Sequence, residues 1–242
     1  MTDLIKTRLL IIFMLAFFIV APASAQSTAF PASIITGNPT AVDFQLVTES
    51  NHAAILIDEQ DYSTVKLCAG LFRDDIERVT GYQPLLVTSQ TEAGATCVII
   101  GSIERSRIIK KLISGGKIDV SGVKGNWESC LTQTVDNPLP GIGKALVIAG
   151  SDRRGTAYGI FALSKQIGVS PWYYFADVHP VKRTELSVIA GKHILESPSV
   201  KYRGIFINDE MWGIRPWALN TLAPEEGQGS DLQPTVRYSN SS

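Results

Sequence analysis

Histidine and cysteine, the residues that most often bind metals or act as nucleophiles, are scarce in this sequence. Its 242 residues include only three of each. The histidines, His52, His179 and His193, are scattered without metal-ligand spacing, and no CxxC pair occurs. The GxSxG and HExxH sequences and the Walker and dinucleotide-binding spacings are also missing. The residues therefore support no metal site and no cofactor, and they give no support to serine or zinc hydrolases.

Net charge is small as well. Twenty-two Lys and Arg residues face 23 Asp and Glu residues, which leaves a formal charge of -1 at pH 7. Both signs are interspersed, so bulk electrostatics favour neither nucleic acid nor an anionic membrane as a partner. A hydrophobic fraction of 45% and a charged fraction of 19% are typical of a globular protein with a true core.

The N-terminus carries the features of an export signal. Lys6 and Arg8 precede a continuous apolar run at residues 9–21, and Pro22 and the small residues at 23–25 follow it. A membrane anchor is the competing interpretation, but the run is shorter than the roughly 20 residues that span a bilayer. No Cys follows, which argues against a lipoprotein. We expect a signal peptide over residues 1–25, and a secreted or periplasmic mature chain without a membrane span.

Two of the three cysteines, Cys68 and Cys97, are expected to be small buried hydrophobes. Cys68 lies within an amphipathic helix pattern, and Cys97 begins the apolar sequence CVIIGS. Oxidising surroundings would permit one disulfide among Cys68, Cys97 and Cys130, but the sequence does not select the pair.

After a loose segment at residues 26–40, strand and helix patterns alternate. The predicted helices span residues 62–80, 104–113 and 153–167, and Gly81, Gly115 and Gly168 end them. The predicted strands span residues 44–48, 53–57, 85–88, 97–101, 131–135, 145–149, 186–190 and 201–207. This alternation predicts an α/β fold with helices packed on a mixed sheet.

The sequence SDRRGT at residues 151–156 joins a strong strand to a helix. Backbone N–H groups at a helix start, helped by Arg153 and Arg154, can bind a phosphate or a carboxylate. The alternative is structural: Ser151 or Asp152 caps the helix, Gly155 permits close packing, and the arginines bridge to a neighbouring domain. The structural role is favoured, because caps are common at helix starts.

An aromatic run follows at residues 172–175, beginning with Trp172. Such a row can stack on sugar rings, but large aromatic side chains also fill domain interfaces. The interface role is favoured, because Trp and Tyr bury a large area there and still satisfy a polar tip.

Asn208, Asp209 and Glu210 follow the predicted strand at 201–207. Carboxylates at the carboxyl end of a barrel strand commonly contact substrate, and glycoside hydrolysis needs two of them. Adjacent residues on a strand point in opposite directions, so Asp209 and Glu210 are not expected to form that pair. From residue 224 onward, Ser, Gly, Pro and Gln dominate, and disorder is predicted.

Several segments resemble glycoside hydrolase family 115, the xylan α-glucuronidases. They are AAILIDEQDYSTV, DDIERVTGYQP, VIIGS, GKIDVSGVKGNWES, ALVIAGSDRRGTAYGIF, LSKQIGVSPWYYFADV and PSVKYRGIFINDEMWGIRPWA, within residues 53–218. The resemblance implies an α/β domain similar to the one that precedes the barrel in β-hexosaminidases. It also implies a (β/α)8 catalytic barrel that begins near Lys201.

Under this resemblance, residues 26–195 form the N-terminal α/β domain, residues 196–222 form the first strand and loop of a truncated barrel, and residues 223–242 form a disordered tail. Asn208, Asp209 and Glu210 would bind substrate, and the catalytic acid would lie in the rest of the barrel. The resemblance implies release of glucuronic or 4-O-methylglucuronic acid from a xylan-type polysaccharide or oligosaccharide. It also allows a homo-oligomer for full-length members.

Two hypotheses follow for this chain. In the first, it is the N-terminal portion of a secreted α-glucuronidase and is inactive alone. In the second, it is a non-catalytic α/β module that binds carbohydrate or packs against another domain.

Overall fold

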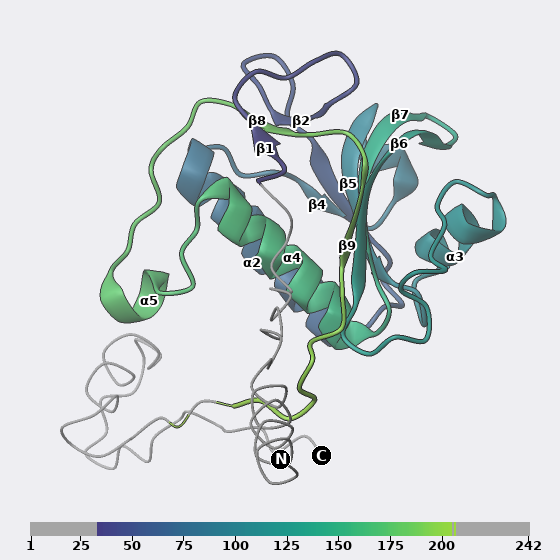
Figure 1. Cartoon of the computed structure of the whole chain (residues 1–242). Helices are drawn as coiled ribbons and strands as arrows, with labels where there is room; N and C mark the ends of the chain where they lie inside the picture. The colour runs from purple at the N-terminus through teal and green to yellow at the C-terminus, as the bar shows by residue number, and fades with distance from the viewer. Residues whose placement is uncertain (1–32, 205, 207–242) are drawn as a thin grey trace, which may run out of the picture. The chain divides into compact units, whose positions relative to one another are not determined.

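The computed structural model describes residues 33–204 and 206 (Figure 1). The described residues up to Ser199 lie in one compact unit, and those from Val200 onward lie in a second unit.

A six-stranded mixed sheet forms the centre of the unit, with the strand order β4-β3-β5-β7-β6-β9. The first four strands in this order run parallel, whereas β6 pairs antiparallel with both β7 and β9. The strands span Ala54–Ile57 (β3), Leu86–Val87 (β4), Thr96–Ser102 (β5), Cys130–Leu139 (β6), Ile142–Gly150 (β7) and Lys192–Leu195 (β9). Strands β3, β5 and β7 are rich in Ile, Val and Ala and buried on both faces, as parallel strands under helices require.

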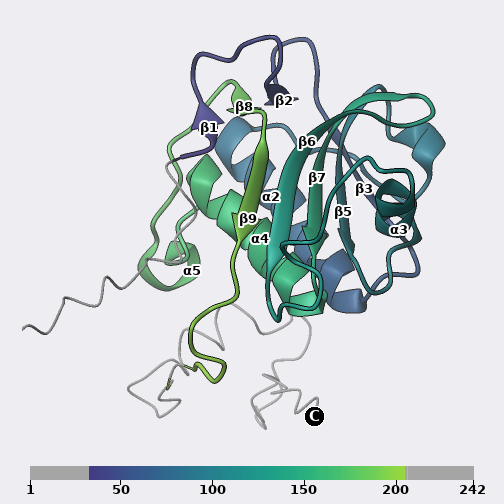
Figure 2. The same ribbon diagram turned by 45° about the vertical axis from the view of Figure 1, so that its right-hand side comes forward.

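Helices cover both faces of this sheet. Helices α2 (Ser63–Thr80) and α4 (Arg153–Ile167) lie side by side on one face, and α3 (Arg107–Ser114) lies on the other (Figures 1 and 2). Alternate residues of β5 point to the two sides: Val98 and Ile100 join the core under α2 and α4, while Cys97 and Ile99 join the core under α3. The predicted α/β fold with helices on a mixed sheet is confirmed. Short turns of helix also occur at Gln90–Glu92 (η1) and Tyr173–Ala176 (α5).

Helix α2 forms because its apolar residues recur along one face. Val65, Phe72, Ile76 and Val79 are all fully buried against the sheet. The helix ends at Gly81, which adopts a left-handed conformation with φ of 79° and donates its N–H to the Glu77 carbonyl. The predicted helix and its glycine terminator are both confirmed.

Helix α4 lies unusually close to the sheet because three glycines leave room for it. A Cβ at Gly150 would collide with the backbone of Thr156, and one at Gly155 would collide with the Ser129 carbonyl oxygen. A Cβ at Gly159 would overlap the Cys130 side chain. The glycines in the sequence AGSDRRGTAYG therefore fix the distance between α4 and strands β6 and β7, which confirms the predicted packing role of Gly155.

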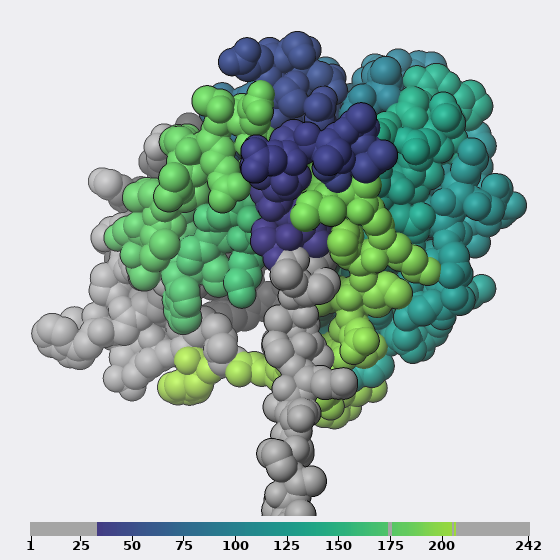
Figure 3. Space-filling model, turned by 45° about the horizontal axis from the view of Figure 1, so that its top comes forward, coloured from purple at the N-terminus to yellow at the C-terminus, as the bar shows by residue number. Residues whose placement is uncertain are grey.

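A second, three-stranded sheet closes one end of the core, with the order β1-β8-β2. It joins Ile35–Thr36 (β1) and Phe44–Val47 (β2), near the start of the described residues, to Leu186–Val188 (β8), near their end. Asp43 stabilises the contact between these two segments. Its carboxylate accepts hydrogen bonds from the backbone N–H groups of Thr40 and Ala190 at 2.7 and 2.8 Å. Figure 3 shows the purple N-terminal segment against the light green residues that carry β8.

Some predicted elements differ from the structure. Helix α3 begins at Arg107 and not at Glu104, because the Ser106 hydroxyl accepts the Ile109 N–H and caps the helix there. Strand β1 lies inside the segment expected to be loose. The strand predicted over 201–207 is wrong for residues 201–204 and 206, which are not in a strand; residues 205 and 207 lie outside the description. The last strand of the sheet is instead β9, which pairs with β6 from Cys130 to Gln133.

All three cysteines are buried and free, which confirms the predicted burial of Cys68 and Cys97. Cys68 and Cys130 belong to the core under α2 and α4, whereas Cys97 lies on the opposite side of the sheet. Burial raises the pKa of the Cys97 thiol to about 12, so it stays protonated and unreactive at neutral pH.

Replacing Gly159 by Ala tests the close approach of α4 to the sheet. The added methyl must displace Cys130 and Ile148, whose nearest side-chain atoms are fixed in the core. We expect the free energy of unfolding to fall by about 1–3 kcal/mol, measured by urea denaturation followed by circular dichroism.

The matched control is Gly70→Ala, which is also within a helix but has nothing within 4 Å of the new Cβ. It should raise the unfolding free energy by up to about 1 kcal/mol, since Ala is the better helix former. Equal effects at the two positions would contradict the packing role.

Candidate functional site

The residues predicted to bind substrate, Asn208, Asp209 and Glu210, lie outside the described residues. Within the α/β unit, charged side chains lie at three places where a ligand could bind. These are the start of α4, the carboxyl edge of the parallel strands, and a cavity between α2 and α4.

The start of α4 is occupied by the chain's own carboxylate. Asp152 caps the helix, because its Oδ1 accepts the Gly155 N–H at 2.6 Å and its Oδ2 accepts the Glu128 N–H at 2.9 Å. Arg154 forms an ion pair with Glu128 at 2.9 Å, within the same unit. The predicted cap is confirmed. The predicted bridge from the arginines to a neighbouring domain stays a prediction; within the unit, Arg154 pairs with the buried Glu128 carboxylate.

The carboxyl edge of β3 and β5 is filled in the same way. Ligands commonly bind at this edge of α/β sheets, but here Asp61 accepts hydrogen bonds from the Ser102 N–H and hydroxyl at 2.7 and 2.6 Å. Asp58 accepts the Arg107 N–H at 2.6 Å at the start of α3 and pairs with the Arg107 guanidinium at 3.0 Å. Burial tends to raise the pKa of Asp58, but the hydrogen bonds from Arg107 and Gln60 outweigh burial, so its pKa is lowered. Both carboxylates therefore have a structural role at this edge of the sheet.

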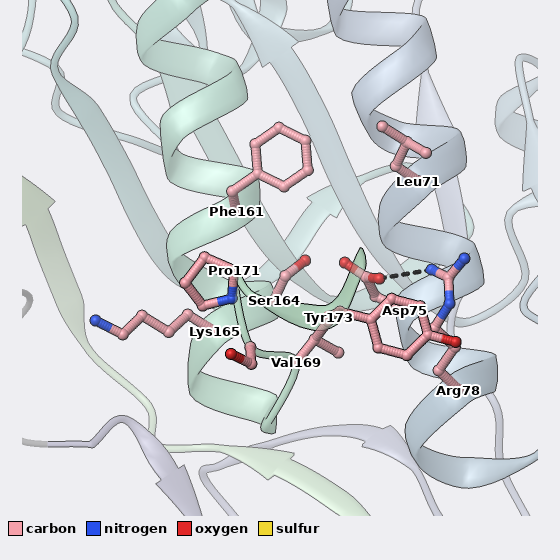
Figure 4. A pocket seen from close by; sticks show the side chains of 10 residues that line it. Leu71, Asp75, Arg78, Phe161, Ser164, Lys165, Val169, Pro171 and Tyr173 are labelled. Carbon is pink, nitrogen blue, oxygen red and sulfur yellow. Dashed lines mark hydrogen bonds and ion pairs between the residues drawn. The ribbon is translucent and has the colours of Figure 1, made fainter. Parts of the chain in front are cut away.

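A cavity of about 280 Å³ opens between α2, α4 and the start of α5 (Figure 4). Its residues come from segments about ninety positions apart in the chain. Helix α2 contributes Leu71, Asp75 and Arg78; α4 contributes Phe161, Ser164 and Lys165; and Val169, Ser170, Pro171 and Tyr173 complete the lining. Most of the lining side chains are apolar or aromatic, and the polar groups of Asp75, Arg78 and Ser164 lie close together (Figure 4).

Asp75 is the carboxylate of this cavity. Its Oδ1 pairs with Arg78 at 2.8 Å, and the Arg78 guanidinium also lies over the Tyr173 ring, 4.9 Å from the ring centre. In Figure 4 the Ser164 hydroxyl faces Asp75 from the opposite helix. Burial raises the pKa of Asp75, although Ser164 and Arg78 act in the opposite direction. A buried acid of raised pKa in a cavity is a mark of functional sites.

This geometry favours binding over bond cleavage. Glycosidases use two carboxyl groups roughly 5–9.5 Å apart, and Asp75 is the only carboxylate among the described residues that line the cavity. Aromatic walls with one carboxylate and one guanidinium can recognise a ligand that has an apolar face and hydrogen-bonding groups.

The loop that closes the cavity is well fixed. Gly168 adopts a left-handed conformation, and the Val169 N–H returns to the Ser164 carbonyl at 3.0 Å. Further along, Lys182 and Arg183 hydrogen-bond to the carbonyls of Arg78 and Val79 at the end of α2. Both ends of the segment that carries α5 are therefore attached to helices that form the cavity.

The aromatic run does not act as one row. Tyr173 is half-buried in the cavity wall and meets His179 edge-on at 5.5 Å, whereas Trp172 is 63% exposed. The side chains of Tyr174 and Phe175 lie outside the description.

Sequence reasoning missed Asp75, although a signal was present. Asp75 lies three residues after Phe72 and four before Val79, so the helical period of α2 places it on the apolar face. A charged residue at such a position requires a partner or a function.

The described residues were also compared with the requirements of a metal site and of a membrane span. No group of His, Cys, Asp or Glu side chains within residues 33–204 is arranged to hold a metal ion. In that same part of the chain, every helix is too short or too polar to cross a bilayer.

A family model and a solved structure both point to glycosyl hydrolase family 115. The sequence model of glycosyl hydrolase family 115 matches residues 195–236. A solved family GH115 4-O-methyl-α-glucuronidase, with specificity for decorated arabinogalactans, is 34% identical to this chain with a TM-score of 0.61. The similarity covers 77% of this chain but 22% of that one, so the chain spans about a fifth of this relative's length. No match was found among curated proteins.

More distant similarity extends to β-N-acetylhexosaminidases from Streptomyces plicatus and Streptomyces coelicolor A3(2). Each is 13% identical to this chain, with a TM-score of 0.40, and the match covers 71% of this chain and 26% of the other.

Replacing Asp58 by Asn tests the structural use of the carboxylates at the sheet edge. Because the pKa of Asp58 is lowered in the folded state, its stabilising effect is complete above the unfolded-state pKa near 4 and is lost as pH falls further. At pH 7 the variant should lose about 1–3 kcal/mol of unfolding free energy.

Urea denaturation at pH values from about 7 to 3 measures this effect. The difference from the unaltered protein should shrink as pH falls below about 4. Asp74→Asn is the control, since its ion pair with Arg73 is about one third exposed on both sides and should contribute below about 1 kcal/mol. A difference that does not change with pH would refute the ionic role of Asp58.

Proposed function

Because this chain belongs to glycosyl hydrolase family 115, we propose that it is the N-terminal part of a secreted glycoside hydrolase that removes glucuronic or 4-O-methylglucuronic acid side chains from a polysaccharide. The observation that carries the proposal is the 34% identity over 77% of the chain to a 4-O-methyl-α-glucuronidase. The agreement of the fold, at a TM-score of 0.61, supports it.

In this proposal residues 26–195 form the α/β domain and residues 196–222 begin the catalytic barrel. The family match at residues 195–236 supports this placement, because it covers the segment that holds Asn208, Asp209 and Glu210. Asp209 would contact the sugar in the active site, with Asn208 and Glu210 beside it. Export would follow from the signal features around Lys6, Arg8 and the apolar run after them.

The α/β domain itself would take no part in hydrolysis. Its buried carboxylates are Asp43, Asp58, Asp61, Asp75 and Glu128, and each has a hydrogen-bond or ion-pair partner within the domain. None of the other four lines the cavity that holds Asp75. The domain would thus supply a frame and a binding surface, while the acid and the base come from the barrel.

The 242-residue chain should release no glucuronic acid. Two substrates are needed for this assay: glucuronoxylan, the polymer proposed here, and a decorated arabinogalactan, the substrate type of the solved relative. A full-length family 115 glucuronidase is the positive control, and chromatography of the released sugar is the measurement. Release by the chain above the level of a heat-inactivated sample would overturn its proposed inactivity.

The second candidate is a non-catalytic module that binds polysaccharide or packs against another domain. The exposed indole of Trp172, at 63%, favours it. If this surface binds xylan, insoluble xylan should retain the protein, and Trp172→Ala should reduce retention at least about fivefold.

Val181→Ala is the control for Trp172→Ala, because Val181 is 80% exposed and follows on the same segment. Its retention should match that of the unaltered protein. Equal retention of Trp172→Ala, or no retention of any of the three proteins, would leave domain packing as the role of Trp172.

A further inference from the structure

We propose that the cavity between α2 and α4 is a non-catalytic subsite for a single pyranose ring. The inference rests on the proposed function only in that the sugars to be tested are taken from it. That the cavity can bind a sugar ring follows from its size and its lining residues. Nothing about the site requires the residues predicted to bind substrate, Asn208 to Glu210.

The size of the cavity suits one ring. Pockets for drug-sized ligands span about 300–1,000 Å³, and this cavity is slightly smaller, at about 280 Å³. It lies between two packed helices and a loop that is hydrogen-bonded at both ends, so its walls are pre-formed.

The walls match the two kinds of surface on a pyranose. Phe161 and Tyr173 offer aromatic faces for the C–H groups of the sugar, and Leu71 and Pro171 extend the apolar surface. Figure 4 shows these side chains around the space in which the Asp75 carboxylate lies.

Asp75 would bind the sugar hydroxyls. Arg78 pairs with Oδ1 at 2.8 Å, and the carboxylate, whose two oxygens carry about four lone-pair sites, can accept a further donor from the ligand. The Arg78 guanidinium keeps a positive charge beside this carboxylate, so the hydroxyl groups of the sugar would meet a charged acceptor with a fixed position. Charge-assisted hydrogen bonds of this kind are among the stronger polar contacts.

Ser164 adds a further polar group at the same place. Its residue is 3% exposed, and its hydroxyl faces Asp75 without a hydrogen bond of good geometry to any described residue. Buried hydroxyls usually have partners. When a ligand binds Asp75, the Ser164 hydroxyl would donate a hydrogen bond to the same carboxylate and stabilise its position.

Lys165 lies on the rim of the cavity and is exposed. It would favour a sugar that carries a carboxylate over a neutral one, because Arg78 and Lys165 together outweigh the charge of Asp75. The ring could come from a uronic acid side chain or from a neutral backbone sugar, and two probes separate these sources.

The experiment titrates the 242-residue protein with D-glucuronic acid and, separately, with methyl β-D-xylopyranoside, by ligand-observed NMR. We expect saturable binding with a dissociation constant on the order of 1 mM, and the tighter probe identifies the source of the ring. Absence of saturable binding of both sugars up to about 50 mM would overturn the proposal.

Paired variants locate the site. Asp75→Asn should weaken binding about 5–10-fold, because the amide cannot accept in place of both carboxylate oxygens. Asp74→Asn is the matched control: it is the neighbouring residue of α2, it has an ion pair of its own with Arg73, and it does not line the cavity. It should leave the affinity unchanged.

A second pair keeps the test valid if Asp75→Asn unfolds the protein, which thermal denaturation would reveal. Phe161→Ala removes an aromatic wall whose residue is 40% exposed, and it should weaken binding at least about fivefold. Leu67→Ala, at a residue 65% exposed one turn before Leu71, should not weaken binding.

Equal affinities of Phe161→Ala and Leu67→Ala would mean that the sugar binds elsewhere and would refute the assignment. These outcomes are separate from the hydrolysis assay and the xylan retention test. The cavity could fail to bind sugar while the chain is still part of a glucuronidase, and the reverse also holds.

Discussion

The close contact of α4 with β6 and β7 is the constraint on which the rest of the unit depends. Gly150, Gly155 and Gly159 let the helix backbone approach the sheet more closely than any side chain would allow. Asp152 then holds the start of the helix to the β6 side by accepting the Glu128 N–H. Because α2 packs beside α4 on the same face, the position of α4 also sets the width of the space between them.

That space holds the cavity in which apolar walls surround a buried carboxylate. Phe72 and Ile160 are fully buried in the core that these helices share with the sheet, whereas Leu71 and Phe161 line the cavity. Asp75 lies where the two zones join. Burial raises its pKa, yet Arg78 pairs with it, so the carboxylate is held ready for a ligand at little further cost in desolvation.

Much of the frame was predictable because its causes are local. The period of α2, the strand Ile142–Gly150 and the glycine ends of α2 and α4 all follow from residues within one element. Strands β1 and β9 were not predictable, since each exists by pairing with a strand far away in the chain. The cavity was missed for the same reason. Only the charge of Asp75 on an apolar helix face pointed to it.

Most of the buried carboxylates among the described residues have structural roles, and only Asp75 of these lines the cavity between α2 and α4. Asp43 joins the two ends of the described chain, Asp58 and Asp61 close the sheet edge, and Glu128 secures Arg154. A carboxylate that accepts several fixed donors has little capacity left for acid–base chemistry, because those donors lower its pKa or occupy its oxygens. Asp75 differs in having a raised pKa and a place in the wall of a cavity, but it lacks the second carboxyl group that hydrolysis requires. Recognition of a sugar is therefore the chemistry that this unit can perform by itself, and cleavage requires carboxylates from outside it.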